Sequence, residues 1–374
     1  MNNSGFHKKF KLQGKSFESS KDLIDFSKEF SVEVAFFLEQ WFDSNNYIEV
    51  STSGSTGKPT IIQLLKKQML NSAIATGSYF NLPKKTTALL CMPPNYIAGK
   101  MMLVRALTLG WELDVVEPSS TPLKNCVKRY DFSAMVPLQL SNSLTEIHNI
   151  KQLIVGGGVV SKELVATIQE LQTEIFATYG MTETITHIAV KKLNNLRLDS
   201  VLNKKIPNQV ENDVRFRHAE LVSASHYKTL PNIKISIDDR GCLIIDAPNV
   251  ANEICITNDL VELISDTEFK WLGRYDTIIN SGGIKLIPEQ IEAKLAAIVV
   301  QRFFVTGIPD TLLGEKLILV IEGENTLNKD TILNKMKNLN SLLKYETPKE
   351  IYFVGKFVET ETKKVNRLET TKLL

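Results

Sequence analysis

The chain has few of the features that mark metal-rich, secreted or membrane-spanning proteins. Its 374 residues include four cysteines, which are scattered and form no C-x-x-C pair, so neither a disulfide framework nor a cysteine-based zinc site is expected. No run of about 18 consecutive apolar residues is present, so no membrane-spanning helix is predicted. No apolar run follows Met1 as in a signal peptide, and we expect a cytoplasmic protein.

The chain also has no large excess of positive or negative charge. Lysine and arginine total 44 against 42 aspartate and glutamate residues, which gives a net charge of +2. Without a basic block, binding of nucleic acid through a broad electrostatic surface is not expected. The apolar share of 43% is typical of a globular protein, and the length suits one large domain and a smaller one. The oligomeric state stays open, with a homodimer as one arrangement.

Short apolar runs alternate with helical patterns between residues 46 and 190. The apolar runs predict strands at 89–92, 113–116, 134–136 and 153–155. Helices are predicted at 101–107 and, after a Ser161 cap, at 162–171. This alternation predicts an α/β fold with a doubly wound, mostly parallel sheet, which binds ligands beyond the carboxyl ends of its strands.

The pattern changes twice farther along the chain. Between 229 and 264 it predicts a small region of short strands, with a hairpin turn at 238–241. After 276 it predicts a compact α+β region with helices at 288–297 and 328–341 and strands at 302–306, 316–322 and 350–354. We therefore expect a large domain, 1–275, followed by a small, mobile C-terminal domain, 276–374. Residues 211–226 fit neither pattern and form either a surface insertion or an irregular connection.

The strongest local signal is rich in hydroxyls and glycine and follows a strand-like segment at 47–50. It consists of Ser51-Thr52-Ser53-Gly54-Ser55-Thr56-Gly57-Lys58-Pro59-Thr60. Hydroxyls and backbone N–H groups that glycine leaves uncovered suit the binding of a polyphosphate. A P-loop is excluded, because Thr52 stands where its first glycine is required and Pro59 follows the lysine. A flexible Ser/Gly linker is the alternative interpretation.

Three further motifs follow in order along the chain. They are Tyr179-Gly180-Met181-Thr182-Glu183, then Gly273-Arg274-Tyr275-Asp276 before Ser281-Gly282-Gly283, and finally Lys363-Lys364-Val365-Asn366-Arg367. Together with the hydroxyl-rich loop, they make residues 46–367 resemble the adenylate-forming superfamily of acyl-CoA synthetases, luciferases and peptide-synthetase adenylation domains. Within it, segments 92–105, 136–140 and 179–187 resemble the o-succinylbenzoate–CoA ligases of menaquinone synthesis, in a short form that lacks much of the N-terminal subdomain.

The resemblance implies a site for ATP and Mg²⁺. The phosphates would be held by the loop residues Ser53, Gly54, Ser55, Thr56 and Gly57. Thr182 would contact the α-phosphate, and Glu183 would hold Mg²⁺, which prefers one or two carboxylates together with substrate phosphates. Tyr179 would stack on adenine, Gly180 would belong to the nucleotide site, and Gly156, Gly157 and Gly158 would form one wall of the adenine pocket. A tight strand-to-helix turn is the structural alternative for these three glycines.

The resemblance also implies a ribose site and a hinge. Asp259 would bind the ribose hydroxyls, since a carboxylate can accept from both, and Arg274 would add a second contact. Asn258 stands where the family has glycine, and we expect it to keep a turn with positive φ, which asparagine tolerates. Asp276 matches the hinge about which the small domain turns between an adenylating and a thioester-forming pose.

The small domain would supply a catalytic lysine and part of the CoA site. Lys364 matches the lysine whose ammonium offsets the repulsion between the acid and the α-phosphate. Lys363 replaces a family glycine, and Lys364 is favoured because it keeps the family's spacing to Arg367. Gly282 and Gly283 would line the tunnel for the pantetheine arm of CoA.

The acyl pocket is the remaining part of the expected site. Tyr96 stands where related enzymes often have histidine, and His187 is a candidate contact to the acyl group. An aromatic acid with two carboxylates needs a cation for the second one, and Lys100 and Arg105 are the candidates. A structural role in a buried helix is the alternative for each of these cations.

The sequence therefore predicts an AMP-forming acyl-CoA ligase that acts on o-succinylbenzoate, with ATP, Mg²⁺ and CoA. One alternative is an adenylating enzyme that activates another acid or loads a carrier-protein thiol. Another is a degenerate member that binds nucleotide without turnover, which the departures at Thr60, Asn258 and Lys363 suggest.

Overall fold

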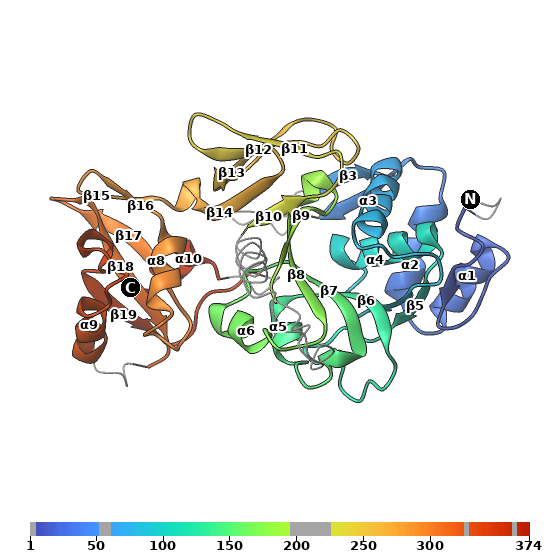
Figure 1. Ribbon diagram of the computed structural model, residues 1–374, viewed down its shortest axis with the longest axis horizontal. Coiled ribbons are helices and arrows are strands. Elements are labelled where there is room, and N and C mark those ends of the chain that lie inside the picture. Colours follow the sequence, from blue (N-terminus) through green and yellow to red (C-terminus); the bar gives the residue numbers. More distant parts are fainter. Residues whose placement is uncertain (1–4, 52–60, 195–225, 325–328, 361–364) are drawn as a thin grey trace, which may run out of the picture.

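A computed structural model of the protein describes residues 5–51, 61–194, 226–324, 329–360 and 365–374. The molecule is elongated, with a small C-terminal sheet at one end and the N-terminal helix α1 (Ser20–Lys28) at the other (Figure 1). No helix in these five stretches is both long and apolar enough to span a membrane.

A twelve-stranded sheet forms most of the described molecule. Its first six strands are parallel and adjacent in the order β1-β5-β4-β6-β7-β8. They are β1 (Lys11–Leu12), β4 (Thr87–Leu90), β5 (Glu112–Val115), β6 (Tyr130–Met135), β7 (Ile150–Val155) and β8 (Glu174–Gly180). Because β5 lies on one side of β4 while β6 to β8 lie on the other, the sheet is doubly wound, as predicted. The carboxyl ends of these strands therefore meet at one edge, where such sheets bind ligands.

Helices cover both faces of the parallel strands, which explains their continuous apolar runs. Leu90 belongs to the core cluster on one face and Leu89 to the cluster on the other, since successive strand residues point in opposite directions. The first face is covered by α2 (Val32–Phe42), α3 (Lys66–Tyr79) and α4 (Ile97–Leu109), and the second by α5 (Pro137–Ser141) and α6 (Lys162–Thr167). Ser161 caps α6 as predicted, by accepting the backbone N–H of Leu164 at 3.1 Å. The helix ends at Thr167, four residues before the predicted end.

The antiparallel strands continue the same sheet and do not form a sheet of their own. Their order after β8 is β9-β10-β14-β13-β12-β11. They are β9 (His187–Lys192), β10 (Tyr227–Thr229), β11 (Lys234–Ile237), β12 (Cys242–Asp246), β13 (Cys255–Leu263) and β14 (Glu268–Arg274). The predicted hairpin turn is confirmed between β11 and β12, where Gly241 has a φ of 80° that favours glycine.

A separate hairpin of β2 (Tyr47–Ser51) and β3 (Ile61–Leu65) holds both ends of the hydroxyl-rich loop. Ser51 and Ile61 are paired residues, so the loop leaves and re-enters the hairpin at the same point. Residues 52–60, and with them Ser53, Gly54, Ser55, Thr56 and Gly57, lie outside the described part of the chain.

The small C-terminal region has its own sheet, joined to the large sheet through the short 3₁₀ turn η4 (Tyr275–Thr277). Its elements are β15 (Ile279–Ser281), β16 (Ile284–Leu286), α8 (Pro288–Leu295), β17 (Phe303–Asp310), β18 (Gly314–Glu322), α9 (Lys329–Lys337), β19 (Glu350–Val354) and α10 (Arg367–Thr371). The predicted helices and strands of this region are present, whereas the β15–β16 hairpin was missed. The change of sheet at η4 lies at the predicted domain boundary. Lys162 on α6 also donates to the carbonyl of Ala293 on α8 and thereby links the two regions.

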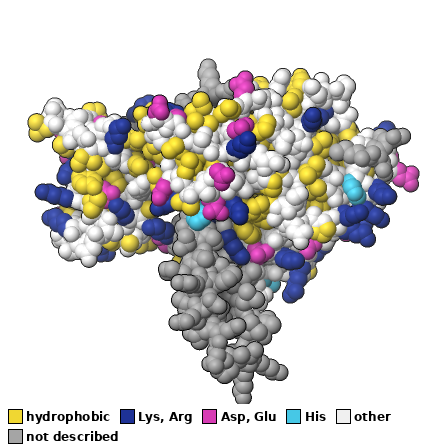
Figure 2. Space-filling model, turned by 45° about the horizontal axis from the view of Figure 1, so that its top comes forward, with side chains coloured by type: hydrophobic (Ala, Val, Ile, Leu, Met, Phe, Trp, Pro, Cys, Tyr) yellow, Lys and Arg dark blue, Asp and Glu magenta, His cyan; other side chains and the backbone are white. Residues whose placement is uncertain are grey.

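Charged side chains of both signs are mixed over the surface seen in Figure 2, with hydrophobic side chains between them. This mixture agrees with the small net charge of +2. Of segment 211–226, only His226 lies within the described residues.

Candidate active site

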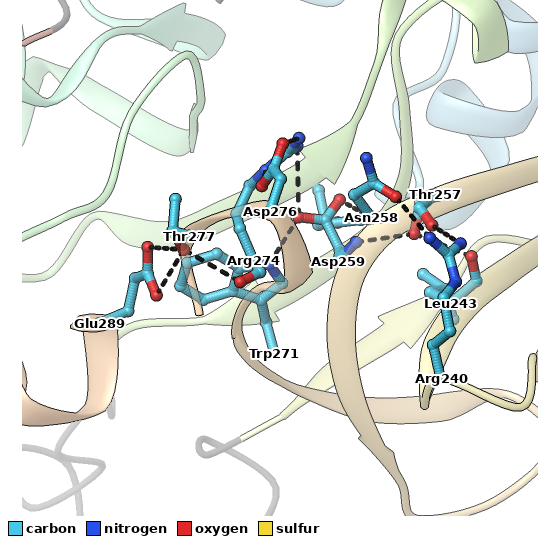
Figure 3. A network of polar contacts seen from close by, with 11 residues as sticks. Arg240, Leu243, Thr257, Asn258, Asp259, Trp271, Arg274, Asp276, Thr277 and Glu289 are labelled. Atoms are coloured by element: carbon cyan, nitrogen blue, oxygen red, sulfur yellow. Dashed lines mark hydrogen bonds and ion pairs between the residues drawn. The ribbon is translucent and has the colours of Figure 1, made fainter. Parts of the chain in front are cut away.

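Asp259 lies at a point where several elements converge. It is paired in register with Arg274 across β13 and β14. The Tyr179 hydroxyl donates to Asp259 Oδ2 at 2.6 Å, and Trp271 Nε1 donates to Oδ1 at 3.0 Å. The Asp259 backbone N–H donates to Thr257 Oγ1 at 3.0 Å (Figure 3). Because a carboxylate has about four acceptor positions, two donors leave room for hydroxyls, which suits the predicted ribose contact.

Arg274 lies between Asp259 and the predicted hinge residue Asp276. Its Nε and Nη2 donate to the two carboxylate oxygens of Asp276 at 2.9 and 2.6 Å, and its Nη1 is 3.8 Å from Asp259 Oδ1 (Figure 3). These hydrogen bonds from Arg274 hold the pKa of Asp276 below its usual value. The same pair raises the pKa of the guanidinium. A bidentate pair of this kind fixes direction as well as charge, so Arg274 ties the predicted hinge residue to the predicted ribose contact.

Asn258 does not form the turn expected from the sequence. It lies inside β13 and is not among the described residues with positive φ, so the backbone is extended where we predicted a turn. Arg240 holds it there, by donating to Asn258 Oδ1 at 3.0 Å and to the Thr257 carbonyl at 3.1 Å. The Arg240 guanidinium also lies 5.0 Å from the Tyr275 ring centroid. Asparagine is accommodated because a strand at this position needs no glycine.

Tyr179, the predicted adenine contact, belongs to an aromatic cluster. The rings of Tyr179 and Phe269 meet edge to face at 5.1 Å, and Tyr227 stacks on Phe269 at 5.4 Å. Burial and the nearby Asp259 charge raise the pKa of Tyr179 above its usual value. Tyr179 therefore stays protonated and keeps donating to Asp259, so this side chain joins the aromatic cluster to the carboxylate.

Two of the three glycines after β7 occupy positions that favour glycine. A Cβ on Gly156 would lie 2.5 Å from Thr178 Oγ1, so this position needs a glycine for close packing against β8. Gly157 has a φ of 78°, which disfavours residues with a side chain. The nearest atom to a Cβ on Gly158 is 3.6 Å away, on Pro137. The glycines therefore form a tight turn at the carboxyl edge of the sheet, and a pocket wall there remains a prediction.

Thr182 and Glu183 lie on η2 (Thr182–Thr184), directly after β8. Glu183 is exposed, and η2 packs against β3, which carries the end of the hydroxyl-rich loop. The structure thus brings the expected α-phosphate contact and the expected metal ligand to the base of the loop.

The residues present fit Mg²⁺ bound largely through a polyphosphate. Among the described residues, no group of three or more His, Cys, Asp or Glu side chains converges on a metal position. A single exposed carboxylate at Glu183 matches an ion that commonly takes one or two carboxylates and completes its shell with phosphate and water oxygens.

Arg105 is buried on α4 without a carboxylate partner among the described residues. Only 1% of it is exposed, and its Nε donates to Thr76 Oγ1 at 3.3 Å. Its Nη1 points at the sulfur of Met102 at 3.8 Å, and its Nη2 has no hydrogen-bond partner within the described structure. Burial lowers the pKa of Arg105 to about 9. His187 Nε2 lies 3.5 Å from the same Thr76 hydroxyl, so the structure brings Arg105 and His187 together.

The other two expected acyl-pocket residues lie apart from this pair. The Lys100 ammonium lies 5.3 Å from the ring centroid of Phe37 on α2, and burial lowers its pKa. Tyr96 precedes α4 and is 45% exposed. Arg105 contacts α3 whereas Lys100 contacts α2, so the geometry favours Arg105 as the cation near His187.

The small domain places its glycines in a hairpin turn. Gly282 and Gly283 join β15 to β16 with φ values of 58° and 82°, which explains why glycine occupies both positions. A contact to CoA remains a prediction. Lys363 and Lys364 lie outside the described residues. After them, Arg367 donates to Glu292 Oε2 at 2.9 Å and thereby anchors α10 to α8.

Sequence reasoning missed Trp271 and Thr76. Trp271 stands three residues before Arg274, and its role emerges only when β13 and β14 are paired. Thr76 lies on a helix that carries no motif, and it joins Arg105 to His187 only through the packing of α3 on α4.

Comparison with known proteins finds relatives in one enzyme family. Residues 44–259 match the family of AMP-binding enzymes. The 2-succinylbenzoate–CoA ligase of Listeria monocytogenes is 25% identical over 357 residues, covering 88% of this chain and 70% of the relative. The enzyme of the same name from Staphylococcus aureus strain Newman is 24% identical over 335 residues, covering 84% of this chain. The chain spans only 65% of the length of that relative.

Solved structures show the same fold. An acyl-CoA synthetase (AMP-forming)/AMP-acid ligase II-like protein from Dyadobacter fermentans is 35% identical, with a TM-score of 0.55, and the match covers 91% of this chain and 93% of that one. The o-succinylbenzoate CoA synthetase of Bacillus subtilis, in complex with its acyl-adenylate intermediate, has a TM-score of 0.71 at 21% identity. That match covers 86% of this chain and 68% of the other. With more than half of its length matched by the family and a relative of similar size at 35% identity, the chain belongs to the AMP-binding enzyme family.

Proposed function

We propose that this protein is an AMP-forming acid–thiol ligase that makes o-succinylbenzoyl-CoA from o-succinylbenzoate, ATP and CoA through an acyl-adenylate. Membership of the AMP-binding family and the named function of the relatives support the reaction and the acid. A reaction that uses ATP and CoA also fits the cytoplasmic location expected from the sequence. The chain would work as a large domain, 1–275, and a small domain, 276–374, that turns about Asp276.

The observation that carries the choice of acid is the buried guanidinium of Arg105. A buried charge without a counterion costs several kcal/mol, so an anionic ligand that reaches it gains a strong partner. Arg105 Nη2 has no partner within the described structure, and His187 lies close by. o-Succinylbenzoate has two carboxylates, of which one is activated and the other is free to pair with Arg105. Lys100 and Tyr96 would then border the pocket without holding that carboxylate.

In the first step, a carboxylate oxygen of the acid attacks the α-phosphorus of ATP and pyrophosphate leaves. Asp259 and Arg274 would hold the ribose, and Tyr179 and the glycines at 156–158 would hold adenine. Thr182 and the loop at 53–57 would bind the phosphates. Bound Mg²⁺, held by Glu183, would neutralise charge on the phosphates. The Lys364 ammonium would offset the repulsion between the acid and the α-phosphate, which is greatest in the transition state.

In the second step, the thiol of CoA gives its proton to solvent and attacks the acyl carbonyl, and AMP leaves as its phosphate oxygen takes the electron pair of the broken C–O bond. The small domain would turn about Asp276 so that Gly282 and Gly283 face the pantetheine arm. Asp276 is held by Arg274 at 2.6 Å, and a turn would have to rearrange this pair. The hinge and the ribose site would therefore change together.

The test is pyrophosphate release from MgATP and o-succinylbenzoate, with and without CoA, with the product identified by mass. We expect acyl-adenylate without CoA and o-succinylbenzoyl-CoA with it. Release with another aryl or fatty acid, but not with o-succinylbenzoate, would keep the reaction class and discard the acid. ATP binding without release for every acid would instead identify a nucleotide-binding protein without turnover.

A further inference from the structure

The segment between β8 and β9 reverses the chain within very few residues. Gly180, at the end of β8, is the register partner of His187, at the start of β9. A Cβ on Gly180 would lie 2.2 Å from the Thr186 carbonyl oxygen and 2.5 Å from the His187 Cα. Only glycine allows the two ends to approach this closely, so residues 181–186 form a closed loop.

This loop contains a γ-turn with a positive φ at its centre. The Thr186 N–H donates to the Thr184 carbonyl at 2.7 Å, across Ile185. Ile185 has φ 67° and ψ −58°, values that are rare and strained even among turns. The residue is β-branched and 0% exposed, so it is held in this conformation inside the core.

Backbone strain of this kind costs about 1–3 kcal/mol and persists only where its surroundings enforce it. In this loop the Thr184 side chain helps to hold Ile185 in its strained conformation. Its hydroxyl accepts the Met181 N–H at 3.3 Å and lies 3.1 Å from the Met181 carbonyl oxygen. It is also 2.9 Å from the Thr186 carbonyl oxygen. The hydroxyl is fully buried and therefore joins the two sides of the loop where water does not compete.

The residues that the loop carries are those expected to bind the nucleotide. Thr182 and Glu183 occupy the first two positions of η2, before the γ-turn, and η2 packs against β3. Their places are fixed by the 3₁₀ hydrogen bonds from Thr184 N–H to Met181 and from Ile185 N–H to Thr182, at 3.2 and 3.0 Å. After the γ-turn the chain enters β9 at His187, beside Arg105. One strained loop therefore sets the spacing between the nucleotide contacts and the acyl-side histidine.

We propose that Thr184 and Ile185 are positioning residues for adenylation, because they hold η2 in the one orientation that presents its carboxylate to MgATP. This inference rests on the function proposed above. Both side chains are 0% exposed, so we expect neither of them to touch a substrate. Their effect passes through Glu183, whose place depends on the closed loop.

The test compares Thr184→Val with Thr184→Ser. Valine keeps the shape but leaves the Met181 N–H and the Thr186 carbonyl without their partner, whereas serine keeps the hydroxyl. Residues that orient a metal ligand typically contribute about 10–100-fold to metal affinity or activity. We therefore expect Thr184→Val to raise the Mg²⁺ concentration needed for half-maximal pyrophosphate release by about 10-fold or more. For Thr184→Ser, this Mg²⁺ concentration should stay within about threefold of that of the unmodified protein, because serine keeps the hydroxyl.

Thiolysis of supplied acyl-adenylate by CoA serves as the control, because it needs neither ATP nor release of pyrophosphate. Thr184→Val should keep this half-reaction. Equal loss of both half-reactions with a lower Tm, or equal behaviour of the valine and serine variants, would overturn the inference. Should Thr184→Val not fold, Thr184→Cys makes the same comparison, since a thiol hydrogen-bonds weakly. If the unmodified protein releases no pyrophosphate with any acid, the proposed function fails instead.

Discussion

Tyr179 and Asp259 are 80 positions apart in the chain, yet the Tyr179 hydroxyl donates a 2.6 Å hydrogen bond to an Asp259 carboxylate oxygen. The contact joins the end of β8 to the middle of β13. It therefore connects the residue expected at adenine with the residue expected at ribose and fixes their separation. Trp271 holds the other carboxylate oxygen at 3.0 Å, so the carboxylate cannot rotate freely.

Tyr179→Phe should weaken ATP binding while keeping the aromatic ring. A hydrogen bond to a charged group contributes about 1.5–3 kcal/mol, so we expect the KM for ATP to rise by about 10-fold or more. The KM for the acid should change little. Tyr227→Phe is the matched control, because Tyr227 contacts the same Phe269 ring but its hydroxyl is bonded to no described residue. Equal effects of the two substitutions would show that the ring matters and the hydroxyl does not.

Arg105→Met should have opposite effects on substrate binding and on stability. Removing an uncompensated buried charge should stabilise the ligand-free protein by about 1–3 kcal/mol, seen as a higher Tm. The same change should raise the KM for o-succinylbenzoate by about 100-fold, since the partner of a buried carboxylate is lost.

A substrate lacking the ring carboxylate, 4-oxo-4-phenylbutanoate, provides the control for Arg105. It should be a poor substrate of the unmodified protein and should be affected little by Arg105→Met. If the substitution instead lowers the Tm and impairs both acids equally, Arg105 is a structural residue. Lys100→Met, which alters the cation beside Phe37, should leave the preference between the two acids unchanged.

The parallel half of the fold was predictable because its strands are buried on both faces. Runs such as 153–155 are apolar without alternation, and they are separated by helical patterns of the length a crossover needs. The glycine-rich turn after β7 and the hairpin at 238–241 were predictable for a similar reason, since glycine marks backbone that other residues disfavour. The end of α6 was predicted wrongly: the helix ends at Thr167, where no glycine or proline marks an end in the sequence.

The site could be predicted only where a motif carries it. Asp259 and Arg274 were found through their motifs, but their pairing across β13 and β14 depends on a sheet register that the sequence does not reveal. The extended backbone at Asn258 was missed for the same reason. The strain at Ile185 could not be foreseen, since isoleucine normally argues against a positive φ. Arg105 was a candidate from the sequence, but its lack of a counterion is a property of the packing.

The stability of the protein should depend on pH through His187. Burial and the Arg105 charge hold the pKa of His187 well below the usual 6.5. Below pH 6.5 the unfolded chain binds a proton at this residue that the folded protein does not, so the folded state loses stability as pH falls. The Tm should therefore drop more steeply between pH 7 and pH 5 for the unmodified protein than for His187→Gln, measured by scanning calorimetry. Parallel curves for the two proteins would show that folding does not lower the pKa of His187.

Lys364→Ala should slow adenylation while sparing thiolysis, because the ammonium is needed only while the acid approaches the α-phosphate. Loss of one charge that stabilises a transition state costs about 100–1,000-fold, and single-turnover pyrophosphate release should fall by that factor. Thiolysis of supplied acyl-adenylate should be largely kept, since the small domain would have turned Lys364 away. Lys363→Ala is the matched control, one residue earlier, and should change adenylation by less than about 10-fold. A larger loss of adenylation in Lys363→Ala than in Lys364→Ala would assign the catalytic ammonium to Lys363. Equal loss of adenylation and thiolysis in Lys364→Ala would contradict two separate poses of the small domain.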